Sequence, residues 1–113
     1  MIPSGVEVYI ASKPVDFRKG PASLMAMVQD AGINNPLDGS LYVFRSKRAD
    51  KVKVVWYADG ICLFAKTIEG KFCWPPINGE TVQLNYAQLL TLLDGMDWRL
   101  VRRPTIQRPQ YVS

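Results

Sequence analysis

The sequence predicts an α+β domain: an antiparallel β-meander of about four to five strands, with two helices packed on one face. Three observations predict this class. Four apolar or β-branched runs follow one another in the middle of the chain, separated by turn residues. Apolar residues recur at helical spacing in one segment before these runs and in another after them. Strands and helices that occupy separate parts of a chain are typical of α+β domains.

The central runs form the predicted meander. They cover residues 41–45, 51–57, 61–68 and 71–74. Gly60 and Gly70, each preceded by an acidic residue, supply the positive φ that tight hairpin turns require, whereas residues 46–50 form a longer polar tip. Successive connections of a meander alternate between the two ends of the sheet. We therefore expect the first and third connections to be neighbours, and the turn at Gly60 to lie at the opposite end.

Alternation within residues 51–57 indicates which strand face is buried. Val52, Val54 and Trp56 share one face, which we expect to contact the core, and the lysines share the other. The leucine-rich helix should cover this face. The predicted core consists of Val52, Val54, Trp56, Leu63 or its neighbour Phe64, Leu89, Leu90 and Leu93.

The first third of the chain predicts one strand and one helix. Residues 6–10 alternate as a strand does, and Pro14 ends that strand because it lacks a backbone donor. Pro21 suits the first position of a helix, in which Leu24, Met25, Val28 and Ala31 share one face. Gly32 is the expected end of this helix.

The last third predicts a short strand at residues 82–84 and a second helix. Asn85 is a good N-cap, and Gln88 three residues later completes a capping box. Leu84 and Leu89 occupy the two positions of a hydrophobic staple. Gly95 is the expected end of the helix.

Length and composition indicate one domain. With 113 residues, of which 48% are hydrophobic, the chain can close one core, which we assign to residues 1–98. Residues 99–113 form a basic tail that we expect to be extended until it meets a partner. No apolar run approaches the roughly 20 residues that cross a bilayer, and the first residues do not resemble a secretion signal, so we expect a cytoplasmic protein.

The charged residues favour a polyanionic partner and disfavour catalysis. Fourteen Lys and Arg against ten Asp and Glu give a net charge of +4, which is compatible with nucleic-acid binding. The chain has no histidine, which excludes Ser/His and Cys/His nucleophilic pairs. Its two cysteines, Cys62 and Cys73, are too few for a four-ligand zinc site, so we expect no metal and no cofactor.

Five blocks of the sequence resemble the TnpB accessory proteins of the IS66 family of insertion sequences. They are LYVFRSKRADKVKVVW at residues 41–56, DFRKG at 16–20, GICLFAK at 60–66, FCWP at 72–75, and QLLTLLDGMDW at 88–98. The blocks occur in the family's order and span roughly residues 1–100. Two positions depart from the family pattern, since Ala49 replaces an expected glycine and Thr67 an expected arginine.

The resemblance implies a role in transposition beside a separate large transposase and another small protein. It implies DNA, the transposase and other proteins encoded by the same element as partners, and it brings no catalytic residues. We therefore predict a non-catalytic accessory factor that binds DNA or the transposase through a basic surface. The competing prediction is a protein-interaction module that makes no direct DNA contact, and scattered lysines and arginines in the folded domain would favour it.

Basic residues near predicted connections are the candidate DNA-binding residues, because such clusters neutralise phosphates. They are Arg18, Lys19, Arg45, Lys47, Arg48, Lys51, Lys53, Lys66, Lys71, Arg102 and Arg103. The alternative for the hairpin tips is simple solvation, and the alternative for Arg18 is an ion pair with Asp16. Lys13 is expected to lie outside the patch.

Aromatic residues and carboxylates are two further classes of candidate functional residue. Trp56 and Phe64 could stack on bases if displayed on a sheet, but aromatic residues at strand spacing more often fill a core. Carboxylates could hold catalytic metal ions, but Asp38, Asp59 and Glu69 stand next to glycines, where turn formation explains them.

Overall fold

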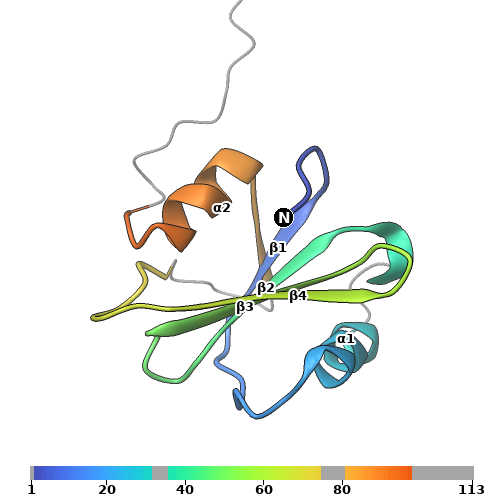
Figure 1. The fold of residues 1–113 in the computed structure, drawn as a ribbon, viewed down its shortest axis with the longest axis horizontal. Coiled ribbons are helices and arrows are strands. Elements are labelled where there is room, and N and C mark those ends of the chain that lie inside the picture. Colours follow the sequence, from blue (N-terminus) through green and yellow to red (C-terminus); the bar gives the residue numbers. More distant parts are fainter. Residues whose placement is uncertain (1, 32–35, 75–80, 98–113) are drawn as a thin grey trace, which may run out of the picture.

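A five-stranded sheet forms the centre of the molecule (Figure 1). The computed structural model describes residues 2–31, 36–74 and 81–97. The strand order is β4-β3-β2-β1-β5. The strands are β1 (Val8–Ala11), β2 (Leu41–Arg45), β3 (Lys51–Tyr57), β4 (Ile61–Thr67) and β5 (Thr81–Leu84). The helices are α1 (Pro21–Asp30) and α2 (Tyr86–Leu93), and a short 3-10 turn covers Pro36–Asp38. The predicted α+β class is confirmed.

The sheet is mixed, because β1 lies parallel to β2. Val8 pairs with Leu41 in this parallel ladder, whereas β2–β3, β3–β4 and β1–β5 are antiparallel. The purely antiparallel arrangement predicted from the sequence is therefore wrong at one pair of strands. The reason is local: α1 connects β1 to β2, and a helical crossover carries the chain back to start a parallel strand.

The two helices cover opposite faces of the sheet, so the prediction that both pack on one face is wrong (Figure 1). Leu89, Leu92 and Leu93 of α2 belong to a core with Val52, Val54 and Trp56. Leu24, Met25 and Val28 of α1 pack against Tyr42, Phe44 and Val55 on the other face. Both faces are covered because β3 buries consecutive residues, Val54, Val55 and Trp56, whose side chains alternate between the faces.

The predicted core is confirmed in large part. Val52, Val54, Trp56, Leu89 and Leu93 are buried. Phe64 is partly buried against this cluster, whereas Leu63 keeps 39% of its surface exposed. Leu90 is 41% exposed and Leu92 takes its place, because positions 89, 92 and 93 lie on one side of a helix of 3.6 residues per turn.

Local signals at the helix ends are confirmed. The Asn85 side chain accepts a hydrogen bond from the Gln88 amide at 2.7 Å, and the Asn85 amide donates to the Gln88 side chain at 3.0 Å. Gly95 follows α2 with φ +78°, the left-handed conformation that ends many helices. Pro21 is the first residue of α1, as predicted. Gly32 lies outside the described residues.

Residues 71–74 do not form the predicted fourth strand of the meander. Phe72 is buried in the α2-side core, and its amide donates to the carbonyl of Ala49 at 2.6 Å. The indole Nε1 of Trp74 donates to the carbonyl of Ala11 at 3.0 Å. These two aromatic side chains thus hold the segment against the α2 side of the sheet. This packing, not strand formation, explains why residues 71–74 are rich in apolar side chains.

Candidate nucleic-acid interface

Two connections meet at one end of the sheet, and we call this the basic end. The hairpin tip at residues 46–50 joins β2 to β3, and residues 68–72 follow β4. The amide of Ile68 donates to the carbonyl of Asp50 at 2.9 Å, next to the bond between Phe72 and Ala49. The predicted proximity of the first and third connections is therefore confirmed. The turn after β3, at Asp59 and Gly60, lies at the opposite end.

The tip is held in shape by its own polar groups. The Ser46 hydroxyl lies 3.0 Å from a carboxylate oxygen of Asp50 and accepts a hydrogen bond from the Lys51 amide at 3.1 Å. Ala49 completes the tip with φ +59°, a left-handed conformation that favours glycine. This is the position where the sequence departs from the glycine expected in the family. The backbone of the tip is thus fixed while its basic side chains take no part.

Four cations on or directly beside these two connections are exposed: Lys47, Arg48, Lys51 and Lys71. None of their side chains forms an ion pair with another residue in the described part of the chain. Lys66 is partly buried on the α2 side of β4, where it stands opposite Val52. Within the described ranges, these four side chains are therefore not held by an ion pair.

Arg45 is fastened to the tip. Its guanidinium Nη1 lies 3.4 Å from the carbonyl oxygen of Ser46 and 3.5 Å from that of Lys47. Its Cζ lies 6.0 Å from the ring centroid of Trp74. Arg45 therefore contributes positive charge to this end, but its side chain is used to hold the tip against the segment after β4.

Lys53 holds the loop before α1 against the sheet. Its Nζ donates to the carbonyl of Phe17 at 2.7 Å and to that of Lys19 at 2.9 Å, and it lies 4.7 Å from the Phe17 ring centroid. The sequence grouped Lys53 with the tip cations, but the structure gives it internal partners. The Phe17 contact was missed, although an aromatic residue beside Arg18 and Lys19 was visible in the sequence.

Arg18 forms the ion pair with Asp16 that was the alternative to phosphate binding. Two guanidinium nitrogens bind the carboxylate, with Nη2 at 2.7 Å and Nε at 3.1 Å, and the Arg18 amide adds a bond at 2.9 Å. The side-chain hydrogen bond from Arg18 lowers the pKa of Asp16 to about 2, and the same contact raises the pKa of Arg18. Lys19 is exposed at its side chain.

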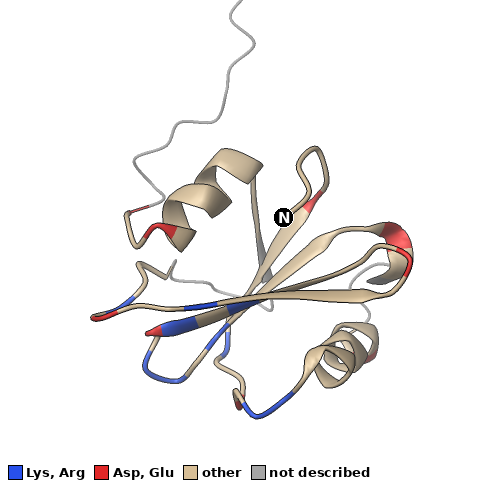
Figure 2. Ribbon diagram, viewed as in Figure 1, with Lys and Arg blue, Asp and Glu red and all other residues tan. Residues whose placement is uncertain are grey.

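All ten Lys and Arg of the described residues gather at the basic end, in its connections or in adjoining strand residues (Figure 2). Lys13 is among them, so its expected position outside the patch is wrong: β1 is parallel to β2, and the Val15 amide bonds the carbonyl of Arg45 at 3.0 Å. Asp16, Asp50 and Glu69 lie at this end too. Arg102 and Arg103 lie outside the described residues.

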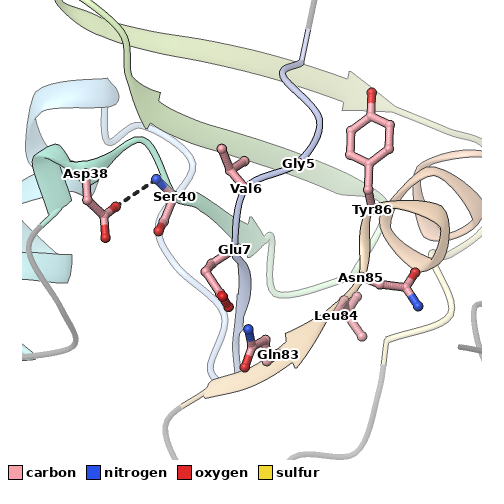
Figure 3. Close-up of a pocket in the computed structure, with 9 residues that line it drawn as sticks. All are labelled: Gly5, Val6, Glu7, Asp38, Ser40, Gln83, Leu84, Asn85 and Tyr86. Atoms are coloured by element: carbon pink, nitrogen blue, oxygen red, sulfur yellow. Dashed lines mark hydrogen bonds between the residues drawn. The ribbon is translucent and has the colours of Figure 1, made fainter. Parts of the chain in front are cut away.

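The opposite end of the sheet is acidic, with Glu7, Asp38 and Asp59 (Figure 2). A pocket of about 620 Å³ opens there between β1 and the junction of β5 and α2, where Glu7 and Tyr86 line it (Figure 3). Asp38 accepts a hydrogen bond from the Ser40 amide at 2.8 Å, as a turn-forming aspartate does. The sequence did not predict this pocket, because its walls come from three distant segments.

The aromatic and acidic candidates have structural places. Trp56 and Phe44 are buried, so neither ring is available for stacking on a base, and Phe64 is partly buried against the core. Within the described ranges, no three potential metal-ligating side chains of His, Cys, Asp or Glu come together. No helix in this part of the chain is long and apolar enough to span a membrane.

The fold and the basic end define a small mixed-sheet domain that presents cations on hydrogen-bonded connections. Residues 6–103 match the family described as IS66 Orf2 like protein, and the chain belongs to this family. It is thereby associated with insertion sequences, a class of mobile element. No solved structure matches the chain.

Two curated relatives come from Sinorhizobium fredii. "Uncharacterized protein y4jC" is 35% identical over 111 residues, covering 96% of this chain and 95% of the relative. "Uncharacterized protein y4hO" is 45% identical over 103 residues, covering 88% of this chain and 90% of the relative. The similarity thus extends over nearly the whole length of each protein.

Proposed function

We propose that this protein is a non-catalytic accessory factor in transposition of an insertion sequence, and that it binds DNA directly through the basic end. Membership of the IS66 Orf2-like family supports the association with transposition. DNA, the transposase and other proteins of the same element are the proposed partners, and the cytoplasm is the proposed location.

One observation carries the DNA-binding part of the proposal. Backbone hydrogen bonds fasten the tip to the segment after β4. On or beside these two connections, Lys47, Arg48, Lys51 and Lys71 are exposed and form no ion pair with any other described residue. A fixed backbone with exposed cations suits phosphate contacts, which supply affinity with little sequence preference. An accessory factor that acts beside a sequence-reading transposase needs no more than this.

The competing function is a protein-interaction module without DNA contact. Scattered lysines and arginines would favour it, whereas those described here gather at one end of the sheet (Figure 2). The distribution of charge therefore supports direct DNA binding as the first candidate.

A DNA titration at several salt concentrations tests the proposal. The double substitution Lys47→Ala and Arg48→Ala should weaken binding to all duplex sequences alike and reduce the salt slope by about one unit per lost phosphate contact. Both side chains are exposed, so the free energy of unfolding should change by less than about 0.5 kcal/mol.

The control variant must lower the net charge by the same two units at positions away from the basic end. Ala26→Glu with Gln29→Glu does so at exposed positions of α1, and this variant should retain most of the affinity and the full salt slope. Unchanged affinity and slope in a stable Lys47→Ala, Arg48→Ala protein would exclude the tip and favour the protein-interaction module. Cleavage or joining of DNA by the purified protein with Mg²⁺ or Mn²⁺, abolished by changing one carboxylate, would contradict the non-catalytic assignment.

A further inference from the structure

Strand β4 forms an open edge of the sheet. Among the described residues it pairs only with β3, over all seven of its positions from Ile61 to Thr67. The other edge strand, β5, has four residues. Long apolar edge strands are templates for pairing with another chain, and proteins usually protect them with charges, prolines or bulges.

The ladder with β3 determines which backbone groups of β4 face outward. The bond from the Ile68 amide to the Asp50 carbonyl makes that pair a hydrogen-bonded one, and such pairs alternate along an antiparallel ladder. Cys62, Phe64 and Lys66 therefore direct their N–H and C=O groups toward β3. The odd-numbered residues, Ile61, Leu63, Ala65 and Thr67, direct theirs to the open edge.

The same odd-numbered residues expose their side chains on the α1 side of the sheet. Ile61 is 42% and Leu63 39% exposed, and Ala65 is exposed as well. No charged residue interrupts this apolar trio, since Lys66 lies on the other face. Single exposed leucines are ordinary, but three successive outward positions on an unpaired edge form a surface that is suited to burial.

Charge complementarity points to a second copy of this chain as the occupant. Each molecule has a basic end and an acidic end, and β4 runs from one to the other, starting after Asp59 and ending near Lys71 (Figure 2). Antiparallel pairing of two β4 strands sets the basic end of one copy beside the acidic end of the other. Parallel pairing would set two basic ends together, which is unfavourable.

We propose that two copies pair antiparallel through β4, with Leu63 opposite its own counterpart and Ile61 opposite Ala65. This register is the one that pairs the apolar trio entirely within itself. It uses only residues whose N–H and C=O groups face the open edge, so it adds hydrogen bonds without disturbing the ladder with β3. The result is a continuous sheet of both copies. The inference goes beyond the proposed function and stands whether or not the basic end binds DNA.

Sedimentation or light-scattering measurements of molar mass over a range of protein concentrations provide the first test. The wild-type chain should form dimers. Leu63→Lys should raise the dimer dissociation constant at least about 100-fold, because each dimer loses two apolar contacts and gains two adjacent positive charges. Leu90→Lys is the matched control: Leu90 is similarly exposed, but it lies on α2, so this variant should remain dimeric.

Disulfide cross-linking tests the register without depending on a destabilising charge. In a Cys62→Ala, Cys73→Ala background, Leu63→Cys should form an intermolecular disulfide on mild oxidation, because directly opposite residues have Cα atoms at bridging distance. Ile61→Cys should not cross-link, since it faces Ala65 of the other copy. Unchanged circular dichroism and thermal midpoints would show that the variants fold. A monomeric wild type, a dimer that survives Leu63→Lys, or cross-linking through Ile61→Cys alone would each overturn the proposal.

Discussion

The loop at residues 16–20 and the tip at residues 46–50 each carry two adjacent basic residues, but the fold uses the two pairs differently. In the loop, Asp16 binds Arg18, and the carbonyls of Phe17 and Lys19 bind Lys53. In the tip, Asp50 contacts the Ser46 hydroxyl and forms no ion pair with Lys47 or Arg48, which remain exposed. The position of the nearest carboxylate and carbonyl groups, more than the number of cations, determines which charges remain available to a partner.

The largest expected change in the free energy of unfolding concerns Phe72, in the segment that packs against the tip. Phe72→Ala should lower the free energy of unfolding by about 3 kcal/mol, because it removes a buried aromatic side chain. That side chain anchors the segment whose backbone amide at residue 72 donates to the carbonyl of Ala49 in the tip. Urea unfolding measures the change. Phe72→Leu should cost clearly less. A loss below about 1 kcal/mol for the alanine variant would mean that the tip does not depend on this segment.

Lys53 and Lys51 provide a direct comparison of a bound and a free cation on one strand. Lys53→Ala should lower the free energy of unfolding by about 2 kcal/mol, because two carbonyls lose a charged donor and the Phe17 ring loses its cation. Lys51→Ala, at an exposed position on the same strand face, should change it by less than about 0.5 kcal/mol. Equal effects of the two substitutions would remove the distinction between the two regions.

The tip itself carries backbone strain that a substitution can relieve. Ala49→Gly should raise the free energy of unfolding by about 0.5 to 1 kcal/mol, because glycine adopts φ +59° without steric cost. The control is Ala58→Gly beside the opposite turn: Ala58 has no positive φ, so glycine there only adds freedom to the unfolded chain and should not stabilise the protein. Thermal and urea unfolding measure both. A destabilised Ala49→Gly variant would contradict the strain argument.

The ion pair of the loop should have the smallest effect, visible mainly in a titration. Arg18→Ala should return the pKa of Asp16 from about 2 toward 3.8, as followed by NMR of the carboxyl carbon. The folded-state pKa is depressed, so the pair's contribution to stability is present above about pH 4 and disappears as the pH falls through about 2. Lys19→Ala should move the pKa less, because Lys19 acts only through a weaker charge interaction. An unchanged Asp16 titration in the Arg18→Ala protein would show that the pair does not persist in solution.

Much of the fold could be predicted because its signals are local. The capping box at Asn85 and the turn at Gly60 each depend on a few neighbouring residues. The parallel pairing of β1 with β2 was also present in the sequence, as a strand, helix and strand in succession, but it was interpreted as part of an antiparallel sheet. The two covered faces were indicated as well, since Val54, Val55 and Trp56 form a continuous apolar run where a one-sided strand would alternate.

The candidate site could be predicted in outline but not in detail. Successive hairpin connections alternate between the two ends of a sheet, and from this rule the sequence correctly predicted that the tip and the segment after β4 are neighbours. It could not show that Lys53 and Arg45 bind carbonyl groups, because those partners depend on how the loop before α1 and Trp74 pack against the sheet. The predicted position of Lys13 was wrong because this residue follows β1, and the direction of β1 depends on its parallel pairing with β2.

The position of β1 between β2 and β5 affects how the protein forms during synthesis. Val8 pairs with Leu41 on one side and with Leu84 on the other, so β1, the first strand of this sheet to be translated, gains its second neighbour only when β5 has been made. Until residues 81–84 are translated, one edge of β1 remains open, and the partners of this pair are distant along the chain, which slows their meeting. The nascent chain therefore exposes one edge of a central strand until β5 is translated, and in that interval another chain can pair with this edge.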